Sequence, residues 1–155
     1  MRILFSICLL LSSAHLFAES TFPNGCQAIA VQGEAVAIKS KKSKLVFVHN
    51  LSKSDIWITH PVADPGASAG WTTRLQPDNW SALAVDKSPF IINCIESRPG
   101  HEQQVPCEGV IAVCKWSKVK VPASGEGTFW VGEDMSLSAL TAAVGGRGFV
   151  LPIAK

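Results

Sequence analysis

The sequence predicts a mainly β fold, either a β-sandwich or a small barrel, that is stapled by disulfides and carries one short helix. The first observation is a series of short runs rich in Val, Ile, Trp and Phe, separated by turn residues at regular spacing. The second is an even number of cysteines beyond an export leader. The third is a single segment with helical periodicity near the C-terminus. At 155 residues the chain has the length of one domain.

Residues 1–18 have the pattern of a secretory signal peptide. Arg2 supplies a positive charge, residues 3–11 are almost entirely apolar, and small residues lead to Ala18. We expect cleavage after Ala18, which leaves residues 19–155 as a single exported β-rich domain, periplasmic or secreted. Beyond the leader no apolar run approaches the length of a transmembrane segment.

The strand-like runs are predicted in order along the chain at residues 27–31, 35–38, 45–49, 56–60, 71–75, 80–85, 90–95, 110–116, 118–121, 128–131 and 149–151. The runs at 45–49 and 56–60 are expected to pair as a hairpin with a longer loop. Eight or more short strands in one domain, with regular turns between them, are typical of a sandwich or barrel.

One helix is predicted to begin at Met135 and end at Val144. Apolar or Thr side chains recur at i, i+3, i+4 and i+7 from Leu137, and two glycines follow, as is common at a helix C-terminus. Asp134 is the expected N-cap, because a short carboxylate side chain accepts hydrogen bonds from the first free N–H groups.

Four of the five cysteines lie beyond the leader: Cys26, Cys94, Cys107 and Cys114. An even number in an exported chain indicates two disulfides, with three possible pairings. If residues 109–116 are extended, Cys107 and Cys114 lie about 20 Å apart, too far for a disulfide. We therefore prefer Cys94–Cys107 with Cys26–Cys114; Cys94–Cys114 with Cys26–Cys107 is the alternative. A zinc site is disfavoured because no C-x2-C element is present.

Composition excludes several function classes. The net charge of +2 is too small to indicate nucleic-acid or membrane-surface binding. Five Trp and seven Phe exclude a disordered chain. Neither a P-loop nor a dinucleotide-binding glycine motif is present, so no cofactor is expected.

Two patterns resemble chemical sites but lack their context. Residues 66–70 match G-x-S-x-G around Ser68, yet no apolar strand precedes the motif and no helix follows it, so a flexible loop is favoured over a hydrolase nucleophile. His49 and His60 end neighbouring runs and could form a metal site with Asp64. Their spacing does not support one, and we expect no catalytic or metal-binding residues.

The loop that begins at Pro61 and ends at Gly70 is the favoured contact element, because exposed loops on rigid scaffolds commonly carry function. The candidate partner-binding residues in and around it are His60, Asp64, Trp71 and Arg74. Trp71 and Trp80 flank one turn and could form a stacking surface for a sugar or peptide, although core packing is the favoured role.

Three longer stretches carry a family resemblance: residues 49–85 (HNLSKSDIWITHPVADPGASAGWTTRLQPDNWSALAV), residues 90–116 (FIINCIESRPGHEQQVPCEGVIAVCKW) and residues 127–149 (GTFWVGEDMSLSALTAAVGGRGF). The chain resembles the enhanced-entry protein B family of intracellular gammaproteobacteria. The resemblance implies export to the periplasm or envelope, a link to host-cell entry, and a larger repeat-containing partner that acts in peptidoglycan maintenance. It supplies no active-site motif.

The leading expectation is therefore a non-enzymatic periplasmic or envelope protein-binding domain linked to host-cell entry and envelope maintenance. The expected partner is a protein, either a repeat-containing envelope protein or a peptidoglycan hydrolase. The alternative is an inhibitor of a peptidoglycan hydrolase that acts through the loop from Pro61 to Gly70. A weak hydrolase using Ser68 is a third hypothesis.

Overall fold

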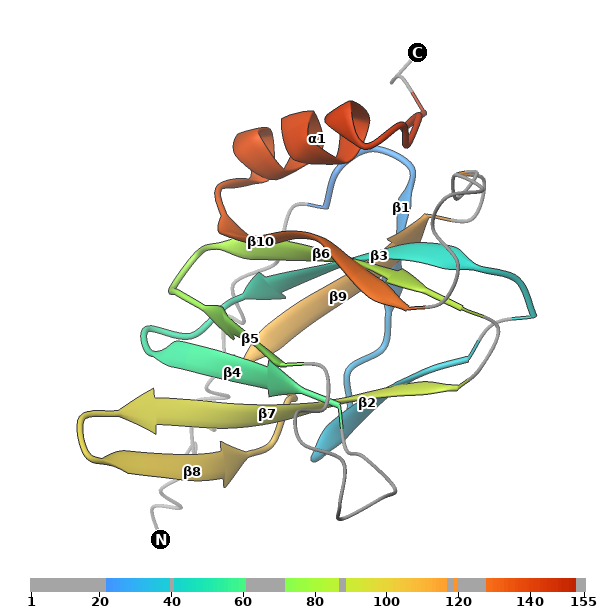
Figure 1. Ribbon diagram of the computed structural model, residues 1–155. Helices are drawn as coiled ribbons and strands as arrows, with labels where there is room; N and C mark the ends of the chain where they lie inside the picture. The colour runs from blue at the N-terminus through green and yellow to red at the C-terminus, as the bar shows by residue number, and fades with distance from the viewer. Residues whose placement is uncertain are drawn as a thin grey trace, which may run out of the picture.

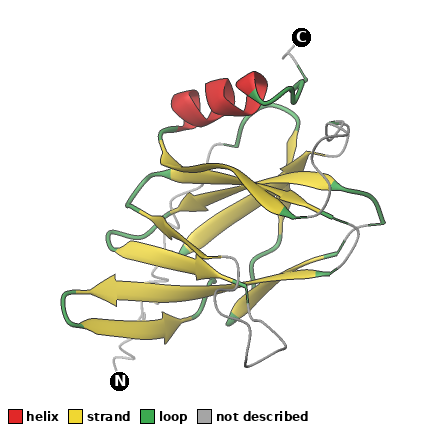
Figure 2. Cartoon of the chain, viewed as in Figure 1, coloured by secondary structure: helices red, strands yellow, loops and turns green. Residues whose placement is uncertain are grey.

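The protein is a β-sandwich with a helix on the outside of one sheet (Figure 1). A computed structural model describes residues 22–39, 41–60, 72–86, 89–116, 119 and 128–152. In this part of the chain, ten strands form two antiparallel sheets that face each other and do not close into a barrel (Figure 2). The predicted mainly β fold with one short helix is confirmed, in its sandwich form.

The first sheet has five strands in the order β1-β9-β3-β6-β10. Their bounds are Cys26–Ile29 (β1), Ile111–Trp116 (β9), Lys44–Asn50 (β3), Trp80–Val85 (β6) and Phe129–Met135 (β10). Every residue of β6 and all but the first of β3 are buried. Both faces of these central strands are covered, which explains why their sequences are nearly continuous apolar runs rather than alternating ones.

The second sheet is organised around one long strand, β7. Its strands are Ala35–Ile38 (β2), Phe90–Arg98 (β7), Asp55–Thr59 (β4), Thr72–Leu75 (β5) and His101–Val105 (β8). β4 pairs with one edge of β7, and β5 pairs with β4. On the other edge of β7, β2 pairs with the first half and β8 with the second half.

The inner core lies between the two sheets. Side chains alternate along each strand, so one set from each sheet points into this layer. The first sheet contributes Val46, Val48, Leu83, Val85, Ile111 and Val113, and the second contributes Val36, Ile38, Ile56, Ile58, Leu75, Phe90 and Ile92. All thirteen are at most 5% exposed, so this layer supplies the main apolar burial of the fold.

A second apolar cluster fills the space between the first sheet and helix α1, which spans Leu137–Gly146. Leu140 and Val144 of α1 are fully buried against Phe47 and Trp116 of the sheet cluster. The ring of Phe47 meets that of Trp116 edge to face at 5.9 Å. The helical periodicity therefore marks the face that covers the sheet.

The helix begins and ends two residues later than predicted, at Leu137 and Gly146, and its N-cap is different. Ser136 is the N-cap, and its hydroxyl accepts a hydrogen bond from the N–H of Ala139. Asp134 adopts a positive φ of 48°, which turns it out of the helical path. Its carboxylate accepts hydrogen bonds from the loop that precedes β6 instead, so the predicted Asp134 cap is wrong.

Both preferred disulfides are confirmed. Cys26 and Cys114 are joined across β1 and β9, with Cα atoms 5.5 Å apart. Cys94 and Cys107 are joined at the end of the β7–β8 pair, with Cα atoms 5.3 Å apart. Neither disulfide joins directly opposite residues. Cys114 faces Ala28 and bonds to Cys26, two positions earlier; Cys94 faces Val105 and bonds to Cys107, two positions later.

Three strand predictions need correction. β3 and β4 do not form a hairpin: β3 pairs with β6 and β9, whereas β4 pairs with β5 and β7 in the other sheet. The stretch between Cys94 and Cys107, in which no strand was predicted beyond residue 95, forms the β7–β8 hairpin. Residues 149–151 are not a strand. Phe149 instead packs into the second apolar cluster, between the first sheet and α1. The run at 118–121 lies largely outside the described residues.

Gly132 of β10 is required by the close approach of the helix. A Cβ added there would lie 2.6 Å from Cδ1 of Leu140, which is fully buried. We expect Gly132→Ala to lower the free energy of unfolding by about 1–3 kcal/mol through overpacking, as measured by urea denaturation.

The matched control is Gly145→Ala, within the helix. A Cβ at Gly145 meets no atom within 4 Å, so this change is expected to stabilise the protein by about 0.5–1 kcal/mol through helix propensity. Equal effects of the two changes would show that the contact between Gly132 and Leu140 does not limit the packing.

Candidate functional site

The outer face of the second sheet is the candidate binding surface, which we call the open face. None of the described helices or strands lies over it, whereas α1 covers the outside of the first sheet (Figure 1). The alternation of side chains and the strand register place the following residues on it: Ala35, Ala37, Asp55, Trp57, Thr59, Thr72, Arg74, Ile91, Asn93, Ile95, Ser97, Glu102 and Gln104. The open face therefore combines a few apolar side chains with many short polar ones.

Trp57 lies at the centre of the open face. The register places Arg74 directly opposite it on β5 and Ile95 directly opposite it on β7. The indole is half-buried, and its Nε1 is shielded from solvent with no hydrogen-bond partner among the described residues. Ile91, further along β7, is 38% exposed. Trp and Arg are enriched at the energetically important positions of protein-binding surfaces. Here Trp57 lies between Arg74 and the partly exposed aliphatic side chain of Ile95.

A hollow of about 690 Å³ lies at one end of the open face. Its lining residues are Asp55, Arg74, Ser97, Arg98, Pro99, Gly100, His101 and Glu102. The turn of the β7–β8 hairpin forms one wall, and Gly100 in this turn has a φ of 74°, which favours glycine. We refer to this feature as the hairpin hollow.

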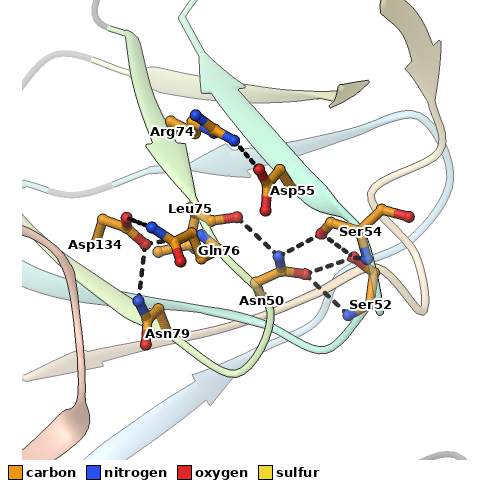
Figure 3. Close-up of polar contacts among 9 residues, drawn as sticks. All are labelled: Asn50, Ser52, Ser54, Asp55, Arg74, Leu75, Gln76, Asn79 and Asp134. Atoms are coloured by element: carbon orange, nitrogen blue, oxygen red, sulfur yellow. Dashed lines mark hydrogen bonds and ion pairs between the residues drawn. The ribbon is translucent and has the colours of Figure 1, made fainter. Parts of the chain in front are cut away.

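Two ion pairs hold the charged side chains in and beside the hairpin hollow. Arg74 donates to Asp55 across β5 and β4 (Figure 3). Arg98 Nη2 lies 2.8 Å from Glu96 Oε2. A hydrogen bond from Ser54 and the neighbouring Arg98 hold the pKa of the Glu96 carboxyl below its usual value, so this group is ionised at neutral pH.

The side chain of Asn50 anchors the strands that carry Arg74 and Asp55 (Figure 3). Its Nδ2 donates to the carbonyl oxygens of Leu75 and Ser54, each at 2.8 Å. Its Oδ1 accepts from the N–H of Ser52 at 2.9 Å. Asn50 is 1% exposed, so these bonds are made inside the protein and fix the entrance of β4 against the end of β5.

Asp134 connects the same corner of the sandwich to β10 (Figure 3). Its carboxylate accepts hydrogen bonds from the backbone and side-chain N–H groups of Gln76 and from Nδ2 of Asn79. Its own N–H donates to Ser81 Oγ at 3.0 Å. These four bonds stabilise the positive φ of Asp134 and the loop that leads from β5 into β6.

The structure brings only part of the predicted partner-binding set to one surface. Arg74 lies on the open face and lines the hairpin hollow. His60 does not point to the same place: its Nδ1 lies 2.7 Å from the carbonyl oxygen of Ile91, and its ring stacks on Phe90 at 4.2 Å. Asp64 and Trp71 lie outside the described residues, as does the loop from Pro61 to Gly70 with Ser68.

The histidines are separated rather than gathered. His49 belongs to β3 of the first sheet, where its Nε2 lies 3.0 Å from Asp78 and its ring stacks on Trp80 at 4.0 Å. His60 follows β4 in the second sheet. In the described part of the chain no group of three His, Cys, Asp or Glu side chains is placed to hold a metal ion. Trp80 is only 5% exposed, so it packs in the core and is not a stacking surface.

Sequence reasoning missed Trp57 and the β7–β8 hairpin. Trp57 lies within an apolar run, DIWIT, in which nothing distinguishes its outward position from the inward positions of its neighbours. The hairpin carries one signal, a Pro99–Gly100 pair that is typical of a turn. The polar sequence HEQQV that follows gives no strand pattern, because β8 is exposed along almost its whole length.

The fold and the open face define a disulfide-linked β-sandwich domain in which no described helix or strand covers the outer face of the second sheet. No family model matches the chain, and neither a curated protein nor a solved structure is significantly similar to it. Within the described residues, no helix has the length and apolar character needed to cross a membrane.

Proposed function

We propose that this chain is an exported, non-enzymatic domain that binds a protein partner through the open face. The observation that carries the proposal is that one sheet is covered by α1 whereas the other presents Trp57, Ile91 and Ile95 without a covering element among those described. An apolar centre with a polar rim is the common arrangement of a protein-binding surface.

Export is supported by two features. Residues 1–18 have the pattern of a signal peptide, and the remaining four cysteines are all used in disulfides. Disulfides persist in oxidising compartments such as the periplasm and the extracellular space. The link to host-cell entry and envelope maintenance, and a repeat-containing envelope protein as the partner, are proposed from the family resemblance alone. A peptidoglycan hydrolase is the alternative partner, proposed from the loop 61–70, which lies outside the described residues.

The proposal is tested by comparing the proteins captured from envelope extract by the purified domain and by Ile91→Asp. An aspartate at this exposed position places a charge in the apolar part of the open face and should weaken capture of a specific partner at least tenfold. The readout is the affinity of the isolated partner, measured by calorimetry.

The matched control is Val150→Asp, because Val150 is an exposed aliphatic residue that lies outside the open face, 81% exposed. Val150→Asp should capture the partner as well as the unchanged protein does. Equal capture by Ile91→Asp, with an unchanged melting temperature, would contradict the open face as the binding surface.

A further inference from the structure

The lining of the hairpin hollow is polar and carries no net charge. Its two arginines, Arg74 and Arg98, are balanced by two carboxylates, Asp55 and Glu102. A ligand with a large charge of either sign would meet attraction and repulsion in equal measure, so electrostatics disfavour phosphates, nucleic acids and strongly acidic or basic peptides. The hollow suits a neutral ligand.

Several hydrogen-bonding groups of the hollow are held in place before any ligand arrives. Arg74 and Asp55 are paired with each other, and the Asn50 network holds the backbone of their chain neighbours Leu75 and Ser54. Arg98 is held by Glu96. Ser97 and Glu102 face each other in the strand register and add a hydroxyl and a carboxylate. Held donors and acceptors lose little entropy on binding, and they favour a ligand that is itself dense in both.

Trp57 does not line the hollow itself, but it is half-buried on the open face beside the lining residues. It lies two residues from Asp55 on the same face of β4 and directly opposite Arg74. The volume of about 690 Å³ is within the usual range of small-molecule sites. A sugar ring combines these requirements, because its hydroxyl groups both donate and accept hydrogen bonds and its C–H face packs against an aromatic ring.

We propose that the hairpin hollow is a binding site for a neutral saccharide. Arg74, Asp55 and Glu102 form hydrogen bonds with its hydroxyl groups, and Trp57 packs against the C–H face of a neighbouring sugar unit. This function is additional to the proposed protein-binding surface. The two proposed sites share Trp57, but Ile91 and Ser97 are six residues apart on extended β7, about 20 Å, so Ile91→Asp and Glu102→Gln alter the two sites separately.

The test titrates the intact domain with three neutral probes, maltotriose, cellotriose and chitotriose, and follows backbone amide shifts by NMR. At least one probe should shift the amides of residues 97–102, with an affinity that is the same at low and high salt. Trp57→Ala and Glu102→Gln should each weaken that binding at least tenfold. Ile91→Asp and Val150→Asp should leave it unchanged.

The outcomes separate this proposal from the protein-binding one. Loss of partner capture in Ile91→Asp with intact saccharide binding supports both proposals. Absence of shifts at residues 97–102 with all three probes overturns the saccharide site, whatever the result for the protein partner. Shifts caused by triglycine but by none of the sugars would identify a peptide site and would also overturn it.

Discussion

Replacing Cys26 and Cys114 by alanine is expected to lower the free energy of unfolding by about 4–5 kcal/mol. The disulfide closes a loop with a sequence separation of 88, and its loss returns that conformational entropy to the unfolded chain. β1 is also a four-residue edge strand, so it has little pairing of its own to hold it on β9. Urea denaturation of the double variant against the oxidised protein measures the difference.

The size of this effect is large relative to the stability of an ordinary domain, which is about 5–15 kcal/mol. When the protein without residues 1–18 is denatured in the absence of reductant, it should show no free thiols. The control is the unchanged protein in reductant, which loses both disulfides and should be at least as unstable as the variant. A decrease below about 1 kcal/mol would mean that packing, and not the disulfide, holds β1 in place.

Replacing Asn50 by leucine is expected to cost about 3–5 kcal/mol. Leucine has the same number of side-chain heavy atoms in the same branched arrangement, but it leaves the carbonyl of Leu75 and the N–H of Ser52 without their partner in a buried corner. The carbonyl of Ser54 keeps only the hydroxyl of Ser52 as a donor. Each unsatisfied buried group costs about 1–3 kcal/mol. Thermal and urea unfolding measure the loss. Ser52→Ala, which removes one hydroxyl from the same network, should cost only about 1 kcal/mol.

Asn50→Asp tests the same network through the pH dependence of the free energy of unfolding. The new carboxylate would face the carbonyl oxygens of Leu75 and Ser54, so the folded state should raise its pKa above the unfolded value. The variant should then be closest to the unchanged protein in acid and should lose stability as the pH rises through the unfolded and then the folded pKa. A pH-independent difference would contradict the role assigned to Nδ2.

Local patterns predicted most of the elements, and long-range contacts explain the exceptions. The spacing of Leu140 and Val144 correctly identified the buried side of the helix. The start of the helix was wrong because Asp134 is used by Gln76 and Asn79, residues more than fifty positions earlier. No local propensity carries that information.

The same distinction holds for the sheets and the candidate site. An extended run up to Trp116 was enough to disfavour the Cys107–Cys114 pairing, although only Ile111–Trp116 of that run is a strand and residues 107–110 form a turn. The proximity of β3 and β4 in sequence predicted that they pair, but the two strands lie in different sheets. The buried side chain of Asn50, at the end of β3, bonds to Ser54 just before β4 and to Leu75 of β5. Arg74 was found, whereas Trp57 was not, because only the register shows which side chains of a short apolar strand face outward.

The two disulfides are nested, and this has a consequence for how the chain is oxidised. A chain that emerges N-terminus first presents Cys26, then Cys94, and only later Cys107 and Cys114. Oxidation in order of emergence would join Cys26 to Cys94, which is not a native bond. The native pattern requires Cys26 to stay reduced until β9 is available, or a disulfide isomerase to reshuffle the first bond. Maturation of this domain is therefore expected to depend on the order in which its cysteines are oxidised, and not on the presence of an oxidant alone.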